Sequence, residues 1–358
     1  MIWQGVNGTD GAAPMIVKRQ PGNFPFCAPD QNDNVTTIAS GNTISVRSPS
    51  VISRFARVRN VAEAPTVLKQ TLFNLAPPAT VAAIVAFWSF APATWVKGPW
   101  AITLIVLGTL GWVLALEWLN ERHVGWRLTW REFLTDAFYV ALGFTAIDWV
   151  SKHLAENPLE AFKQHSHIAT PWVAHLPFLV QVVMVLFLVE FGQYWMHRFM
   201  HRVYPLWLTH APHHHLTQLN AMKGAVGNPI ELFLISLSVV ALFDFPLVAV
   251  LCAGSASAAV SVFAHANVRS DPPRWYAFFF TTIQHHSMHH SVRYEDTLCN
   301  YANSMILIDR VFGTFRPGEA AVVGQDERKR LSIWEQFMFP FAPVIALIKA
   351  RQQQSSAS

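Results

Sequence analysis

Long apolar segments constrain the fold of this chain more than any other feature of its sequence. Four of them each approach the roughly 20 residues that a helix needs to cross a bilayer. They run over residues 78–96, 100–119, 133–150 and 177–196. Over the whole chain 52% of the residues are hydrophobic and 13% are charged, where a soluble domain has about 25% charged residues. The sequence therefore predicts an all-α integral membrane protein with about four transmembrane helices.

A fifth apolar stretch, residues 229–264, is interrupted at Asp244-Phe245-Pro246. Proline removes a backbone donor and disfavours helix in the residue before it. We therefore expect a re-entrant helical hairpin that enters and leaves the membrane on one side. The chain is polar at both ends, which predicts an unstructured N-terminal arm over residues 1–70. The membrane-embedded domain then covers residues 71–340, and residues 341–358 form a tail without fixed structure.

Loop charges predict the orientation in the membrane. Arg-rich and Arg-poor loops alternate along the chain, beginning with several basic residues before the first span and ending with Arg198, Arg202 and Lys223 after the fourth. By the positive-inside rule, the N-terminus and everything that follows the fourth span on that side are cytosolic. The membrane would be a bacterial inner membrane or the endoplasmic reticulum. The net charge of +4 includes no basic run, so no nucleic-acid partner is expected.

Histidines gather after the fourth span. Eight of the 16 histidines lie in three short boxes, with His265 alone between the second and the third. The boxes are His197 and His201 (HxxxH), His210, His213 and His214 (HxxHH), and His286, His289 and His290 (HxxHH). On a helix, residues three and four apart share a broad face, so the boxes can point into one pocket. Imidazole binds Fe, Zn, Cu and Ni, and one tetrahedral ion takes about four ligands. Eight or nine histidines therefore predict two metal ions.

The residues around the boxes add further motifs. Tyr194-Trp195-Met196 precede the first box, Ala266-Asn267 follow His265, Asn300-Tyr301-Ala302 is close to an NYG motif, and residues 309–314 read DRVFGT. Together these motifs resemble the fatty acid hydroxylase/sterol desaturase superfamily of integral membrane proteins. The resemblance covers residues 180–317, and the combination is far more specific than any single box.

The resemblance implies a non-haem di-iron enzyme that uses O2 to oxidise an unactivated C–H bond of a lipid such as a sterol, a fatty acyl chain, an ether lipid or an isoprenoid. It also implies four transmembrane helices capped by a cytosolic helical domain that carries the boxes. Hydroxylation and desaturation both remain open. No HPGG motif of a fused cytochrome b5 is present, so electrons would come from a separate ferredoxin or cytochrome b5 with its reductase. The implied iron ligands are His197, His201, His210, His213, His214, His265, His286, His289 and His290.

Some positions depart from the family pattern. Ala302 replaces a glycine, and Ser261 stands one turn before His265 where some relatives have a second histidine. Asn228 stands where some relatives have histidine, so it is a candidate weak ligand or hydrogen-bond partner. His215 and His285 flank the boxes at positions outside the pattern, which makes them poorer candidates for ligands.

Acidic side chains are candidates for orienting the imidazoles, because metal-bound histidines usually donate their second N–H to an acceptor. Glu190 lies seven residues before His197, two turns away on the same helix face. Glu190 and Asp309 are the first choices; a helix–helix hydrogen bond and a turn cap are their respective alternatives. Further candidates are Glu231 and Glu295. Glu117 and Asp148, near the ends of their spans, are expected at the membrane interface.

Two other classes of membrane protein fit the sequence less well than a lipid oxidase. A membrane metal carrier needs polar residues along a path across the bilayer, and the first two spans offer almost none. A zinc-dependent membrane hydrolase needs the glutamate of an HExxH motif, and Arg198 follows His197 instead. A lipid oxidase is therefore the favoured interpretation.

Overall fold

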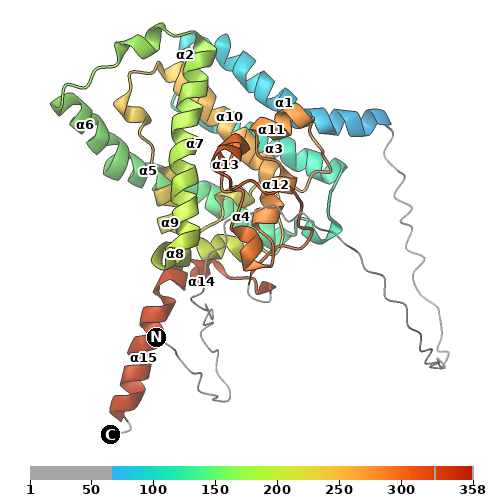
Figure 1. The fold of residues 1–358 in the computed structure, drawn as a ribbon, viewed down its shortest axis with the longest axis vertical. Helices are drawn as coiled ribbons and strands as arrows, with labels where there is room; N and C mark the ends of the chain where they lie inside the picture. The colour runs from blue at the N-terminus through green and yellow to red at the C-terminus, as the bar shows by residue number, and fades with distance from the viewer. Residues whose placement is uncertain (1–66, 326–327, 357–358) are drawn as a thin grey trace.

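The computed structural model describes residues 67–325 and 328–356 (Figure 1). Nearly all of the predicted N-terminal arm, residues 1–70, lies outside these ranges. All the regular elements in the described ranges are helices, accompanied by two isolated β-bridges. The predicted all-α fold is confirmed.

Six helices in the described part of the chain are long and apolar enough to cross a membrane. They indicate an integral membrane protein, and their number exceeds the predicted four. They are α1 (Val67–Ser89), α3 (Ala101–Leu119), the run Trp130–His165, α7 (Phe178–Arg202), α10 (Leu247–His265) and the run Ile333–Gln354.

The first helix differs from its prediction. It begins at Val67 instead of residue 78, and it contains both Pro77 and Pro78. Proline disfavours a helix interior, yet this helix continues through both residues. The preceding turns are held in place by burial, since Phe73 belongs to an apolar cluster with Val262 and Phe263 of α10. The helix ends at Ser89, and a separate short helix, α2 (Ala93–Val96), follows.

The third membrane helix is also longer than predicted, since the helical run from Trp130 to His165 has 36 residues. Two π-helical segments interrupt its regular hydrogen bonding without ending it. Its parts are α4 (Trp130–Leu142), η2 (Gly143–Ile147), α5 (Asp148–Ser151), η3 (Lys152–Glu156) and α6 (Asn157–His165). The short elements η1 (Val124–Trp126) and η4 (Pro171–His175) flank this run.

The predicted break in the fifth apolar stretch is present. After α9 (Pro229–Ser236) and η6 (Val240–Leu242), no helix covers Asp244–Pro246. The Asp244 carboxylate accepts hydrogen bonds from Lys163 Nζ and from the backbone N–H of Thr170, each at 2.6 Å. These bonds fix the turn against the end of α6. Because α10 alone is long enough to cross a bilayer, the re-entrant hairpin stays a prediction.

Helix α10 is the centre of the membrane part and packs against α1, α3, α7 and the short helix α12 (Ile283–His289). Of its most apolar 18-residue stretch, 61% is buried, which is the largest share among the six candidate spans of the described residues. Small residues such as Ala253, Ala256 and Ala259 let neighbouring helices approach closely. The last residue of α10 is His265, so this packing carries one of the singled-out histidines into the protein interior.

The remaining elements complete the described chain. They are α8 (Tyr204–His214), η5 (Lys223–Ala225), α11 (Arg274–Phe279), η7 (Tyr294–Thr297), α13 (Ile306–Val311), α14 (Ile333–Met338), η9 (Phe339–Phe341) and α15 (Ala342–Ser356). In Figure 1, α8 and α14 lie beside the lower end of α7, which carries the first histidine box, while α15 projects away from the body. The tail predicted to lack structure is therefore helical as far as Ser356.

Candidate metal centre

The first histidine box ends the long helix α7. His197 and His201 lie one turn apart in its last two turns, and both are buried. The chain turns at once into α8, which carries the second box. Because only Val203 separates the two helices, the boxes are close in space as well as in sequence.

The structure divides each HxxHH box between two places. On α8, His210 and His214 meet the residues of the first box, while His213 points to a separate group. Residues i and i+4 differ by about 40° around a helix axis, whereas i+3 lies about 60° to the other side. The third box on α12 is divided in the opposite sense, since His289 joins the first group and His286 and His290 join the second.

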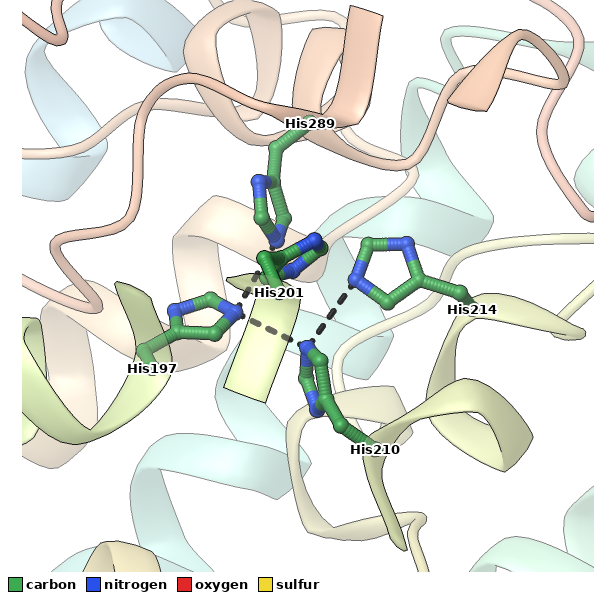
Figure 2. A group of neighbouring side chains, drawn as sticks. All are labelled: His197, His201, His210, His214 and His289. Atoms are coloured by element: carbon green, nitrogen blue, oxygen red, sulfur yellow. Dashed lines mark hydrogen bonds between the residues drawn. The ribbon is translucent and has the colours of Figure 1, made fainter. Parts of the chain in front are cut away.

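Two histidine clusters result, and in each of them one nitrogen from every ring lies within 4.8 Å of the corresponding nitrogens of the other rings. The first cluster is His197, His201, His210, His214 and His289 (Figure 2). The second cluster is His213, His265, His286 and His290. The rings of His214 and His290, one from each cluster, stack with their centroids 4.7 Å apart. The two clusters are therefore direct neighbours, and all nine side chains are buried.

The spacing of the nitrogens fits metal ions. In the first cluster Nε2 of His197 lies 2.9 Å from Nε2 of His210, which is 3.0 Å from Nε2 of His214. In the second cluster Nε2 of His286 lies 2.9 Å from Nε2 of His265 and 3.1 Å from Nε2 of His290. Two imidazole nitrogens bound at right angles to one ion, each about 2.0–2.1 Å from it, are about 3 Å apart.

Backbone carbonyls determine which nitrogen faces inward. Nδ1 of His197 donates to the carbonyl of Tyr301 at 2.6 Å, and Nδ1 of His289 to that of Cys299 at 2.7 Å. In the second cluster Nδ1 of His213 donates to the carbonyl of Val226 at 2.7 Å. A carbonyl can only accept, so the proton is on Nδ1 and the lone pair of Nε2 is free for an ion.

One imidazole has a carboxylate behind it. Nδ1 of His210 donates to Oε1 of Glu231 at 2.6 Å, and both side chains are buried. Glu231 also completes the capping box of α9 with Asn228. Asn228, considered above as a weak ligand, belongs to neither cluster, and its amide donates to the carbonyls of Gln336 and Phe337.

Two further observations show that the residues present suit a metal ion. Both nitrogens of His201 are buried without a hydrogen-bond partner among the described residues, and an ion amid the first cluster would satisfy one of them. Burial lowers the pKa of His210 to about 3, because a buried imidazolium loses its hydration. The rings are therefore neutral, as ligands must be.

Asp309 and Glu190, the first-choice acids of the sequence analysis, accept hydrogen bonds from backbone N–H groups. Neither forms a hydrogen bond to an imidazole of the two clusters among the described residues. Asp309 accepts from the backbone N–H groups of Tyr301 and Ala302, each at 2.8 Å. It thereby fixes the carbonyl of Tyr301 that orients His197. Burial raises the pKa of Asp309 to about 6, against the lowering effect of these bonds. Glu190 lies deeper in the helices and accepts from Ser257 and from the N–H of Ser304.

Other candidates lie outside both clusters. His215 is buried against Phe339, and His285 against Phe315. Burial lowers the pKa of His285 to about 4. Glu295 is exposed.

The loop over residues 220–226 is a support that the sequence argument missed. Buried Lys223 donates to Glu132 at 2.5 Å and to Asp136 at 2.7 Å, both on α4. Glu117, expected at the membrane interface, is instead buried and accepts from the backbone N–H groups of Ala221 and Asn267. Lys223 had been counted only as a loop charge. Lys223 is a single charge in an apolar stretch, and this pattern could have indicated a buried ion pair. It lies three residues before Val226, whose carbonyl orients His213.

The fold and the site define an all-α membrane protein with two adjoining histidine clusters able to bind metal. Residues 182–314 match the family model for fatty acid hydroxylase. The match covers all three histidine boxes and His265, and it confirms the resemblance to the fatty acid hydroxylase/sterol desaturase superfamily that these residues predicted.

Curated relatives are lipid-modifying enzymes. The chain is 32% identical over 160 residues to the ornithine lipid hydroxylase OlsE of Rhizobium tropici, an alignment covering 43% of this chain and 46% of that protein. It is 27% identical over 185 residues to the alkylglycerol monooxygenase of Xenopus tropicalis, covering 49% of this chain and 35% of the relative. The human alkylglycerol monooxygenase is 28% identical over 156 residues, covering 43% and 33%. The chain thus spans less than half the length of each relative. No solved structure matches it.

Proposed function

We propose that this protein is an O2-dependent, non-haem di-iron monooxygenase that hydroxylates a C–H bond of a membrane lipid. The observation that carries the proposal is the pair of adjoining, buried, all-histidine clusters within the fatty acid hydroxylase region. The first cluster would hold one iron ion and the second cluster the other. Hydroxylation is preferred to desaturation because the relatives are a hydroxylase and a monooxygenase.

Two iron ions, when bound, would supply the redox chemistry that activates O2. The chain itself supplies neutral imidazole ligands, and it fixes their orientation through carbonyls and through Glu231. Burial of all nine rings excludes bulk water, which protects a reactive centre from side reactions. The apolar helices around the clusters keep the lipid close to them.

The overall reaction balances as one lipid C–H bond, one O2, two electrons and two protons giving one C–OH group and one water. The electrons require a separate donor protein of the ferredoxin or cytochrome b5 type with its reductase. We place the N-terminus and the histidine clusters on the cytosolic side of a bacterial inner membrane or the endoplasmic reticulum, on the basis of the loop charges.

The proposal is tested with the purified full-length protein. Elemental analysis should find two iron ions per chain, and lipid extracts incubated with the protein, a reducing system and ¹⁸O2 should contain a lipid that has gained one ¹⁸O atom. Comparing the lipids of cells with and without the gene then identifies the natural product. An iron-loaded, reduced protein that oxidises no lipid class would refute the proposal, and loss of two hydrogens without oxygen gain would indicate a desaturase.

A further inference from the structure

A small pocket lies between membrane helix α1 and the elements beside the second cluster. It has room for about 10 Å³, which is about one water-sized group. Its walls are mainly apolar, and no lining residue in the described chain is charged. The lining residues come from α1, the end of α10, the following loop, α11 and the start of α12.

Two residues of this pocket have buried hydroxyls that lack a partner. Tyr276 is 1% exposed and Thr282 is 3% exposed, and neither hydroxyl finds a hydrogen bond among the described residues. The other two hydroxyls of the lining are used, since Ser270 donates to the carbonyl of Phe73 and Thr281 to that of Ala302. A buried hydroxyl without a partner is destabilising, so two in one pocket point to a missing acceptor.

The conformation at Thr282 strengthens this point. Thr282 is the N-cap residue of α12, with extended φ and ψ angles, yet its side chain makes no capping hydrogen bond. A threonine at an N-cap normally accepts from the backbone N–H two or three residues later. Here the hydroxyl forgoes that bond and remains available to the pocket.

The pocket adjoins the second cluster. Thr282 precedes His286 by one turn of α12, and its carbonyl accepts from the backbone N–H of His286 at 3.0 Å. Phe263, another lining residue, precedes His265 by two positions at the end of α10. Since His265 and His286 are the closest pair of the second cluster, the pocket is roughly one helical turn, about 5 Å, from those ligands.

From this arrangement we infer that the pocket seats the carbonyl oxygen of an ester or amide group of the lipid substrate, held by the hydroxyls of Tyr276 and Thr282. A carbonyl oxygen has two lone pairs and can accept from both hydroxyls. A phosphate or carboxylate does not fit, because the lining provides no cation to balance its charge. The inference rests on the proposed function for the identity of the substrate, and it predicts oxidation near the polar end of the lipid.

Binding of two matched probes tests the inference without turnover. Monoolein and 1-O-oleylglycerol have the same chain and glycerol group, and only monoolein has a carbonyl. Full-length protein in nanodiscs should bind monoolein about three- to tenfold more tightly, the range that one or two hydrogen bonds produce. Tyr276→Phe and Thr282→Val should each reduce this preference, and the double variant should abolish it.

Tyr139→Phe is the matched control. The Tyr139 hydroxyl is also buried without a partner among the described residues, but Tyr139 packs with Leu216 and Val226, away from the pocket. This variant should keep the preference for monoolein. Equal binding of the two probes by the unmodified protein, or a preference that survives in the double variant, would overturn the inference and leave the pocket as a water site.

The outcome is separable from that of the proposed function. A carbonyl preference that depends on Tyr276 and Thr282, in a protein that oxidises no lipid, supports the pocket and refutes the monooxygenase. If the protein oxidises a lipid but the two substitutions change neither probe binding nor the position of the product, the monooxygenase is supported and the role of the pocket is refuted.

Discussion

The two histidine clusters lie side by side, yet the protein supports them differently. The first cluster has five imidazoles, and one of them, His210, is backed by the carboxylate of Glu231. The second has four imidazoles, and within the described chain its outward hydrogen bonds go to the carbonyls of Val226 and Ser261. A carboxylate behind an imidazole makes it a stronger ligand. The first cluster should therefore hold its ion more firmly.

The second cluster has one imidazole fewer than the first, which leaves more coordination positions of its ion open. A catalytic ion needs open coordination positions, whereas a fully surrounded ion is structural. The uncharged pocket at Tyr276 and Thr282 also adjoins the second cluster. We therefore expect the first cluster to bind its ion more tightly than the second, and the second cluster to lie nearer to the substrate.

The largest expected effect comes from removing one imidazole from either cluster. His213→Ala should lose the ion of the second cluster, and His201→Ala that of the first, so iron falls from two ions to one per chain. Activity should be undetectable in both variants, because the reaction needs the pair. Elemental analysis of the folded protein measures the loss. His215→Gln, at a buried histidine outside both clusters, should keep both ions; full iron in His213→Ala would exclude the second cluster as a site.

The next effect concerns the loop over residues 220–226, whose Val226 carbonyl orients His213 of the second cluster. Lys223→Met leaves Asp136 buried without its cation, and breaking such a pair costs about 3–5 kcal/mol. The temperature of thermal unfolding should fall. The ion of the second cluster should be lost first, because the Val226 carbonyl that orients His213 moves. In the double variant Lys223→Met/Asp136→Leu part of this cost should be recovered, because no unpaired charge stays buried at position 136. Glu132, the other partner of Lys223, keeps its ion pair with Arg330. A stable single variant with both ions would contradict this role.

The sequence was sufficient to predict the helical membrane fold and to single out the nine histidines that the structure brings together. It did not predict how these histidines are divided between two clusters. Spacing alone places His210, His213 and His214 on one broad face. Which neighbour each ring meets depends on how α8 and α12 pack against α7, and this information is not local. In the same way, the sequence predicted Glu117 at the membrane interface and Lys223 as a loop charge. Both are buried against partners more than 80 residues away in sequence, which local patterns do not reveal.

A smaller effect is expected from the carboxylate that distinguishes the first cluster. Glu231→Gln removes the carboxyl group that accepts the Nδ1–H of His210 and should weaken iron binding or activity about 10- to 100-fold. The loss should fall on the first ion, as measured by competition with a chelator. Glu190→Gln is the control, since Glu190 is a buried acid that makes no hydrogen bond to an imidazole. Equal losses in the two variants would mean that the contact with His210 has no special role.

The smallest effect tests how tightly the loop backs the second cluster. A Cβ atom at Gly224 would lie 3.1 Å from two ring atoms of His265 and 3.3 Å from Oγ of Ser261. Gly224→Ala should therefore displace the His265 ring by a few tenths of an ångström and weaken the second ion only a few-fold, leaving the first unchanged. Gly108→Ala is the matched control, because a Cβ there meets nothing within 4 Å and alanine in a helix interior adds about 0.5–1 kcal/mol of stability. If chelator competition shows the first ion weakened by Gly224→Ala, the two clusters respond as one unit, and the separate supports inferred for them do not act independently.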